Sequence, residues 1–262
     1  SPVDRRTISH FLISFLMRFH ILTLFTQAFH GPFQHSILGL ATRKGLISIL
    51  LTDIRDYTND SHGTADDYQF GGGSGMVLKP EPVFEGVESI RLSAELEDSV
   101  PIILLSPQGR RLNQNIVEEI SMQKEVVLIC GRYEGVDERI RKYLVTDEIS
   151  IGDYVLSGGE LASMVLIDAV SRLISGVVGS IESTQDDSFT TGLLQHPQYT
   201  RPSKFRGWEV PEVLVSGNHA QIDTWRRQES LRRTFILRPE LLESADLTNE
   251  DILFIDSLQK QK

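Results

Sequence analysis

Residues 149–160 read Ile-Ser-Ile-Gly-Asp-Tyr-Val-Leu-Ser-Gly-Gly-Glu, and the rest of the chain can be interpreted outward from this segment. It begins as a strand, passes through a glycine-bearing turn and opens onto an apolar helix that we expect to run to about Ile174. Gly152, Gly158 and Gly159 permit close backbone approaches that a side chain would prevent. Nothing here is an obvious acid, base or nucleophile. The pattern therefore indicates backbone that holds either a ligand or a neighbouring loop.

Short apolar runs alternate with helical patterns before this segment. The predicted strands are 19–25, 46–52, 101–105 and 125–130, and the predicted helices are 34–44, 82–97, 113–123 and 136–144. The nearly continuous apolar run 46–52 suits a sheet that is covered on both faces. This alternation predicts a mostly parallel α/β domain.

Three successive predicted strands end in segments that contain glycine or proline: 106–109, 131–135 and 150–159. We expect all three to be turns. Ligands of open α/β sheets bind at the carboxyl ends of the strands, so we favour one shared pocket over three ordinary turns. Few cations lie in these segments, which argues against a phosphate-rich nucleotide. The glycine cluster 71–75 lacks the spacing of phosphate-binding motifs and is predicted to be a flexible loop near a site.

The chain changes character after about residue 176. We expect an extension over 1–16, a main domain over 17–178, a linker over 179–192 and a mostly helical domain over 193–262. The first segment begins with serine and precedes Met17, so it is interpreted as an extension, a cloning remnant or an alternative start without a role in the fold. In the last domain, Asn218 and Gln221 resemble a capping box that opens a helix to about Phe235. A further helix is predicted over 249–258.

The composition is that of an ordinary globular protein, with 40% hydrophobic and 24% charged residues. The single cysteine, Cys130, ends an apolar strand; it is interpreted as a buried core residue and indicates a reducing cytoplasm. No apolar run reaches the about 18–20 residues of a membrane span. The run 11–25 is interrupted by Arg18 and His20, which disfavours a secretory signal. We therefore expect a cytoplasmic protein without a membrane partner.

The formal net charge of −10 argues against diffuse adhesion to nucleic acid, although a local basic patch can still bind RNA. One such patch combines a predicted helix with the segment before it. Its residues are Arg201, Lys204, Arg206, Arg226, Arg227, Arg232 and Arg233. The alternative is a solvated face whose charge Glu229 compensates. Positive charge gathered on an acidic chain favours contact with RNA phosphates.

Several long motifs occur in one order along the chain from about Met17 to the last helices. They are Ser-Pro-Gln-Gly (106–109), Gly-Arg-Tyr-Glu-Gly-Val-Asp-Glu-Arg (131–139), Ser-Ile-Gly-Asp-Tyr-Val-Leu-Ser-Gly-Gly-Glu-Leu (150–161), Asp-Ser-Phe (187–189), Tyr-Thr-Arg-Pro (199–202), Val-Pro-Glu-Val-Leu (210–214) and Ser-Gly-Asn-His (216–219). Together they resemble the bacterial tRNA (guanine-N1)-methyltransferase family, TrmD, of the SPOUT methyltransferase superfamily.

This resemblance implies a SPOUT domain over 17–178 with a deep trefoil knot, and a helical tRNA-binding domain over 193–262. Periodicity alone does not indicate a knot, and general connection rules argue against one. The resemblance also implies S-adenosyl-L-methionine as methyl donor, a homodimer with the active site at its interface, and 1-methylguanosine at tRNA position 37, just 3′ of the anticodon. A Mg²⁺ requirement is implied too, although no carboxylate cluster in the sequence marks a metal site.

Motif positions carry the donor-binding residues of the family over to this chain. They are Leu105, Ser106, Pro107, Gly131, Tyr133, Glu134, Ser150, Ile151, Gly152, Tyr154, Leu156, Gly158 and Gly159. The family match assigns the base to Asp187 and the stabilisation of guanine O6 to Arg172. The chemistry needs both roles, because N1 carries a proton near neutral pH and its loss spreads negative charge to O6.

Each catalytic assignment has a plainer alternative. Arg172 lies four residues after Asp168 on a predicted helix, a spacing typical of a surface ion pair worth about 0.2–0.5 kcal/mol. On sequence alone that pair is favoured. Asp187 lies beside Asp186, and sequence alone does not choose between catalysis and a solvated carboxylate; the motif register selects Asp187.

The chain departs from the family pattern at several positions. Gln195 and His196 stand where the usual motif has a carboxylate and a variable residue, and the motif histidine is replaced by Gln198. Ala162 replaces a common proline, Ser74 interrupts a glycine-proline-glycine pattern, and Glu229 replaces a usual glutamine. These changes bear on rate and tRNA affinity. They leave two alternatives open: a SPOUT methyltransferase that acts on another RNA, and a noncatalytic RNA-binding homologue.

Overall fold

The computed structural model describes residues 16–178 and 187–260 and divides the chain into two compact units. The first unit ends at Gly179 and the second begins at Ser180, the second residue of the predicted linker. Of the predicted extension, residues 1–15 lie outside the described residues, as do residues 179–186 of the linker.

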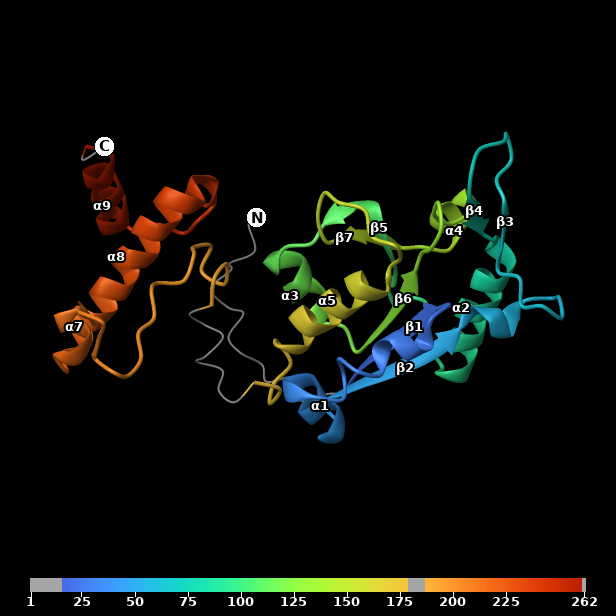
Figure 1. Cartoon of the computed structure of the whole chain (residues 1–262), viewed down its shortest axis with the longest axis horizontal. Coiled ribbons are helices and arrows are strands. Elements are labelled where there is room, and N and C mark those ends of the chain that lie inside the picture. Colours follow the sequence, from blue (N-terminus) through green and yellow to red (C-terminus); the bar gives the residue numbers. More distant parts are fainter. Residues whose placement is uncertain (1–15, 179–186, 261–262) are drawn as a thin grey trace. The chain divides into compact units, whose positions relative to one another are not determined.

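The first unit is built on a five-stranded sheet with the order β2-β1-β6-β5-β7 (Figure 1). Its strands are β1 (Met17–Thr23), β2 (Ile47–Asp53), β5 (Ile102–Arg111), β6 (Glu125–Cys130) and β7 (Asp147–Ser150). Every neighbouring pair is parallel, which confirms the predicted α/β class. Because β5 lies between β6 and β7, two strands that follow one another in the sequence do not pair.

Helices cover both faces of this sheet. They are α1 (Ser36–Arg43), α2 (Pro80–Ser93), α3 (Gln114–Ser121), α4 (Glu138–Tyr143) and α5 (Glu160–Ser171). In β6, Val126 and Leu128 pack into one hydrophobic cluster with α1, α3 and α5, whereas Val127 and Ile129 pack into another with α2 and α4. The strands are continuously apolar because both of their faces are buried, as the sequence indicated.

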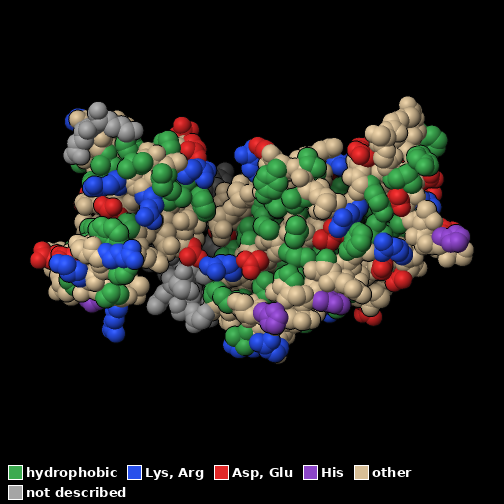
Figure 2. Space-filling view, viewed as in Figure 1, with side chains coloured by type: hydrophobic (Ala, Val, Ile, Leu, Met, Phe, Trp, Pro, Cys, Tyr) green, Lys and Arg blue, Asp and Glu red, His purple; other side chains and the backbone are tan. Residues whose placement is uncertain are grey.

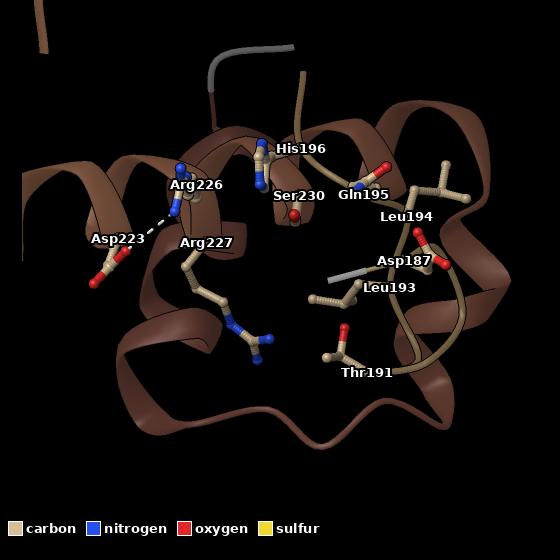
Figure 3. Close-up of a pocket in the computed structure, with 10 residues that line it drawn as sticks. All are labelled: Asp187, Thr191, Leu193, Leu194, Gln195, His196, Asp223, Arg226, Arg227 and Ser230. Carbon is tan, nitrogen blue, oxygen red and sulfur yellow. Dashed lines mark ion pairs between the residues drawn. The ribbon is translucent and has the colours of Figure 1, made fainter. Parts of the chain in front are cut away.

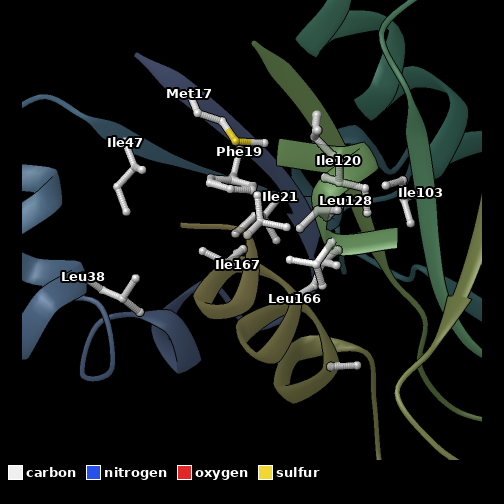
Figure 4. Packing of buried hydrophobic residues seen from close by; sticks show 14 of the residues in the cluster. Met17, Phe19, Ile21, Leu38, Ile47, Ile103, Ile120, Leu128, Leu166 and Ile167 are labelled. Atoms are coloured by element: carbon white, nitrogen blue, oxygen red, sulfur yellow. The ribbon is translucent and has the colours of Figure 1, made fainter. Parts of the chain in front are cut away.

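The larger cluster fixes α5 on the sheet (Figure 4). Phe19 and Ile21 of β1 meet Leu166 and Ile167 of α5, and none of these four side chains is exposed. Full burial of each such side chain is worth about 1.5–3 kcal/mol. The helix that follows residues 149–160 is therefore held against the sheet along its length. It ends at Ser171, three residues before the predicted end.

The prediction that residues 106–109 form a turn was wrong. β5 continues to Arg111, and its pairing with β7 shifts so that both Leu105 and Arg110 lie opposite Ile149. The four residues between them bulge out of the ladder. The other predicted strands and helices are present with ends shifted by a few residues, and β6 has the predicted bounds.

The polar stretch before the glycine cluster also contains structure that the sequence did not indicate. β3 (Asp66–Tyr68) pairs antiparallel with β4 (Met76–Leu78), and the cluster 71–75 lies in the connection between them. Two short 3-10 helices, η2 (Thr26–Phe29) and η3 (Ile54–Tyr57), follow β1 and β2.

The second unit is mostly helical, as predicted. Its elements are β8 (Lys204–Phe205), β9 (Trp208–Glu209), α7 (Glu212–Val215), α8 (His219–Leu237), η4 (Pro239–Glu243) and α9 (Asn249–Gln259). Leu193, Leu231 and Ile255 form its small core. The Asn218 side chain accepts from Gln221 N at 3.3 Å, which is the first bond of the predicted capping box.

In the part of the chain that the structure describes, no helix combines the length and the apolar character needed to cross a membrane.

Candidate active site

The carboxyl ends of β5, β6 and β7 surround a hollow that we name the strand-end pocket. It comprises cavities of about 260 and 50 Å³ that share lining residues. All thirteen residues predicted to bind the donor line it. Leu105, Ser106, Pro107, Leu156 and Gly158 line both cavities; Gly131, Tyr133 and Glu134 line the larger; Ser150, Ile151, Gly152, Tyr154 and Gly159 line the smaller. Ala162 also lines the smaller cavity.

The bulge 106–109 forms the first wall of this pocket. Pro107 has no N–H and cannot contribute a donor to the ladder. Gly109 passes so close to β7 that a Cβ atom there would overlap the backbone of Glu148 and Ile149. Ser106 Oγ accepts from Gln108 N at 3.2 Å and stabilises the bulge locally. The strand therefore bulges out of the ladder at a defined place, beside the hollow.

Arg141 of α4 joins this bulge to β7, and the sequence did not indicate that role. Its Nη1 donates to Gln108 Oε1 at 3.0 Å and to Glu148 Oε2 at 2.6 Å, and its Nη2 donates to Ser106 Oγ at 3.2 Å. The Arg141 side chain is largely buried and also lines the larger cavity. A planar guanidinium with several donors is suited to such a three-way junction.

The second wall, 131–135, rests on the β3–β4 hairpin. Glu134 N donates to Met76 O at 3.0 Å. A Cβ atom on Gly75 would lie 2.5 Å from Glu134 Cγ, so the end of the glycine cluster packs directly against a pocket residue. Tyr133 adopts a positive φ of 60°. Burial raises the pKa of the Tyr133 phenol, and nearby Asp66 raises it further.

The third wall, 151–159, packs closely onto the end of β6. Gly159 N donates to Gly131 O at 2.9 Å. A Cβ atom on Gly159 would lie 2.8 Å from Cys130 Cα, and one on Gly158 would overlap the side chains of Arg132 and Glu160. Gly158 and Gly159 therefore permit close contact between two pocket walls. Contact with a neighbouring loop was one of the two roles expected for this backbone, the other being contact with a ligand.

A buried carboxylate lies behind these two walls. Glu160, at the start of α5, is only 3% exposed. It accepts from Thr23 Oγ1 at 2.8 Å and from Arg132 Nε at 3.1 Å. The Arg132 guanidinium lies 4.2 Å from the centre of the Phe25 ring. Arg132 lines the larger cavity, and its place between Gly131 and Tyr133 was the available sequence signal for it.

The two residues predicted to be catalytic belong to different units. Arg172 directly follows α5, and its backbone N–H donates to Asp168 O at 3.2 Å. Asp187 lies in the second unit, where Thr190 N donates to its carbonyl oxygen at 3.3 Å.

Asp187 lines a pocket of about 240 Å³ within the second unit, which we name the Asp187 pocket (Figure 3). Its walls come from the segment 191–196 and from α8. The lining residues are Asp187, Thr191, Leu193, Leu194, Gln195, His196, Asp223, Arg226, Arg227 and Ser230. Two departures from the family pattern, Gln195 and His196, therefore lie in this pocket. Gln195 N donates to Ser188 Oγ at 2.9 Å, which fixes this stretch beside the turn that contains Asp187.

The predicted RNA-binding cations differ in what they contact. Arg227 forms two hydrogen bonds with the buried Asp251 carboxylate, at 3.1 and 2.7 Å, which is a structural contact. Arg233 donates to Gln195 O at 3.1 Å. The exposed pairs are Lys204 with Glu209 at 2.6 Å, Arg226 with Asp223 at 3.6 Å, and Arg232 with Glu229 at 3.4 Å. Arg201 and Arg206 are exposed, and within the described residues neither forms an ion pair.

Figure 2 shows Lys and Arg side chains interspersed with hydrophobic ones on the visible face of the unit that contains α8. Among the described residues, no group of three His, Cys, Asp or Glu side chains is placed to hold a metal ion.

Comparison with known proteins identifies the family. The family described as "tRNA (Guanine-1)-methyltransferase TrmD" matches residues 17–244. Curated proteins named tRNA (guanine-N(1)-)-methyltransferase are similar over nearly their whole length. One from Dehalococcoides mccartyi (strain CBDB1) is 54% identical over 92% of this chain and 97% of its own. Relatives from Dictyoglomus turgidum (52%) and Bacillus cereus strain G9842 (50%) each cover 94% of this chain and 98% and 100% of their own. The chain therefore belongs to the TrmD family of tRNA (guanine-1)-methyltransferases.

Proposed function

We propose that this protein transfers a methyl group from S-adenosyl-L-methionine to N1 of guanine in tRNA, at position 37. One observation carries the proposal: the thirteen residues predicted to bind the donor, which come from three separated segments, all line the strand-end pocket. The names of the relatives agree with this reaction. We place the SPOUT domain at 17–178 and the tRNA-binding domain at 193–262, joined by a linker at 179–192.

The residues of the strand-end pocket fit the proposed donor. Leu105, Ile151 and Leu156 line the smaller cavity and provide apolar surface for its adenine ring. Glu134 supplies a carboxylate suited to its ammonium group. When bound, the donor supplies an electrophilic methyl group on a sulfonium centre.

In the proposed mechanism, the Asp187 carboxylate removes the proton from guanine N1. General base catalysis of this kind typically contributes about 10²–10⁴-fold to the rate. The Arg172 guanidinium stabilises the negative charge that then develops on O6. Asp187 and Arg172 lie in different units, so this pairing is part of the proposal. Arg226, which lines the Asp187 pocket, supports the role of Asp187, because its exposed guanidinium would attract a phosphate of the target nucleotide.

The proposal includes three further family properties. The first is the trefoil knot, which the family resemblance implies and which the strand order β6-β5-β7 permits. The second is a homodimer, with the active site at its interface, measurable by sedimentation of the purified protein. The third is a requirement for Mg²⁺, measurable by loss of activity with EDTA and its recovery with added MgCl₂. We propose that six cations contact tRNA phosphates: Arg201, Lys204, Arg206, Arg226, Arg232 and Arg233. Arg227 is proposed to attract the tRNA by its positive charge, without direct contact.

The reaction is tested with labelled donor and two tRNA transcripts that carry G or A at position 37. We expect label in the G37 transcript and 1-methylguanosine in its nucleoside digest. Methylation that does not depend on base 37 would instead identify a methyltransferase for another RNA site. Donor and tRNA binding without methylation would identify a noncatalytic RNA-binding homologue. That alternative hypothesis rests on Gln195 and His196, which depart from the family pattern.

Asp187→Asn tests the base. We expect kcat to fall by about 10²–10⁴-fold while the donor Kd, measured by calorimetry, stays unchanged. Asp186→Asn is the matched control, since it removes the neighbouring carboxylate in the sequence, and it should retain activity. Turnover by Asp187→Asn at the wild-type rate would exclude this assignment.

A further inference from the structure

The β8–β9 hairpin presents two aromatic rings that the proposed function does not use. Phe205 and Trp208 pair directly across the hairpin. The two residues between them, Arg206 and Gly207, both have positive φ angles of 52° and 90°. Positive φ at both central positions is the geometry of a type I′ turn, whose twist matches that of the flanking strands. The turn therefore fixes the two aromatic residues opposite one another.

Both rings are exposed, Phe205 by 55% and Trp208 by 69%. Directly opposed side chains of an antiparallel pair lie on the same face, and here the ring centroids are 6.2 Å apart with planes inclined by 47°. We name this surface the aromatic hairpin face. An apolar surface of this kind costs free energy in water unless something covers it.

The charges around the hairpin indicate what would cover it. The Arg206 guanidinium lies 5.2 Å from the centre of the Phe205 ring. The next pair, Lys204 and Glu209, forms a 2.6 Å ion pair, and the period of two along a strand puts it on the opposite face. One face therefore combines aromatic rings with a cation, and the other face carries an internally compensated pair.

We propose that the aromatic hairpin face stacks on an unpaired nucleobase of the tRNA substrate while Arg206 contacts an adjacent phosphate. Every nucleobase has a flat π-face, and exposed aromatic residues next to cations are the common means of binding single-stranded RNA. A second copy of this chain is the alternative occupant, and its binding to this face is one outcome of the test below. This inference rests on the proposed function, which supplies the tRNA.

The other tryptophan makes the test direct. Trp225 of α8 packs near His196 and Tyr199, with ring centroids 6.3 and 6.4 Å away. The chain has only two tryptophans, so Trp225→Phe leaves Trp208 as the single indole reporter. Titration of this variant with a G37 tRNA transcript should quench Trp208 emission to saturation, because a stacked base is an efficient quencher.

Substitutions then separate stacking from simple apolar contact. Trp208→Ala should raise the Kd for tRNA by about 5- to 160-fold, the range for loss of one base–aromatic stack. Trp208→Phe should recover most of that affinity, and Trp208→Leu should not. Leu253→Ala on α9 is the matched control, since Leu253 is also 69% exposed, and it should bind tRNA as the wild type does. Donor affinity should be unchanged in all four variants.

The outcomes distinguish this inference from the proposed function. The inference is wrong and the function stands if the wild type methylates tRNA, Trp208→Ala binds it equally well, and tRNA leaves the Trp208 emission of the Trp225→Phe variant unchanged. If Trp208→Ala instead changes the sedimenting mass without changing tRNA affinity, the face is a contact between copies and the inference is again wrong. If the wild type neither binds nor methylates tRNA, the proposed function fails.

Discussion

Arg141 Nη1 donates to Glu148 Oε2 at 2.6 Å, which ties α4 to the strand beside the pocket bulge. The same guanidinium holds Ser106 and Gln108 of that bulge. Arg141→Met removes all three bonds. Because one lost bond of about 1.4 kcal/mol corresponds to a tenfold change, we expect the donor Kd to rise by about tenfold or more.

If Arg141 only positions the bulge, Arg141→Met should weaken donor binding and leave the chemical step nearly unchanged. The KM for the donor should rise while kcat at saturating donor changes little, and Arg141→Lys should recover only part of the affinity because ammonium lacks the planar fork. Lys142→Met, an exposed neighbour on the same helix, is the control. An unchanged donor Kd in Arg141→Met would show that the bulge holds its shape without this contact.

The Arg227–Asp251 contact gives a pH-dependent contribution to the second unit. Hydrogen bonds from Arg227 hold the pKa of Asp251 below its usual range. The stabilisation is therefore complete above the unfolded pKa of about 3.9 and is lost as pH falls through the lower folded value. Asp251→Asn should destabilise this unit by about 1.5–3 kcal/mol at pH 7, and the difference from wild type should shrink toward pH 3.

Tryptophan fluorescence during urea denaturation measures this effect, because Trp208 and Trp225 both lie in the second unit. Glu250→Gln, an exposed neighbour in the same first turn of α9, is the control and should show no such trend. A stability difference that stays constant from pH 7 to pH 3 would contradict the assigned role of the Asp251 charge.

Gly109 has no room for a side chain. Its Cβ would overlap backbone atoms of Glu148 and Ile149, which cannot rotate away as a flexible side chain can. Gly109→Ala should therefore destabilise the first unit by about 3 kcal/mol or more. Gly31→Ala is the matched control, because nothing lies within 4 Å of a Cβ there, and its effect should stay within about 0.5 kcal/mol. Circular dichroism during denaturation measures both, and equal effects would contradict the close approach.

Cys130 should be chemically inert in the folded protein. Burial raises the pKa of its thiol to about 12, so the reactive thiolate is scarce at pH 8. Ellman's reagent should label no thiol in the native protein and one per chain in 8 M urea, since the chain has a single cysteine. Rapid native labelling would show that the end of β6 opens readily.

The parts of the fold that depend on local sequence were predictable. The strand 125–130 has the predicted bounds because a continuous apolar run ends at a glycine, and Asn113 caps α3 as its residue type indicates. The bulge 106–109 was predicted as a turn because proline and glycine usually mark one. Its actual conformation depends on pairing with β7, about 40 residues away, which local composition does not contain.

The residues of the candidate site likewise include some that the sequence could predict and some that it could not. The thirteen donor residues could be assigned from motifs, because each motif is a contiguous segment at the end of a strand. Arg141 could not, since its importance comes from contacts with Ser106 and Glu148 that only the folded sheet brings together. Arg227 was grouped with the RNA-binding cations, and its buried partner Asp251, 24 residues away, became evident only in the structure.

The position of β5 between β6 and β7 has a consequence for synthesis of the protein on the ribosome. A nascent chain that has emerged only as far as Cys130 can pair β5 with β6, but the other edge of β5 stays open and the bulge has no partner strand. The third pocket wall does not exist until residue 159 has emerged. A truncated product that ends before β7 would therefore expose an unpaired strand edge, which is prone to aggregate, and would lack the pocket altogether.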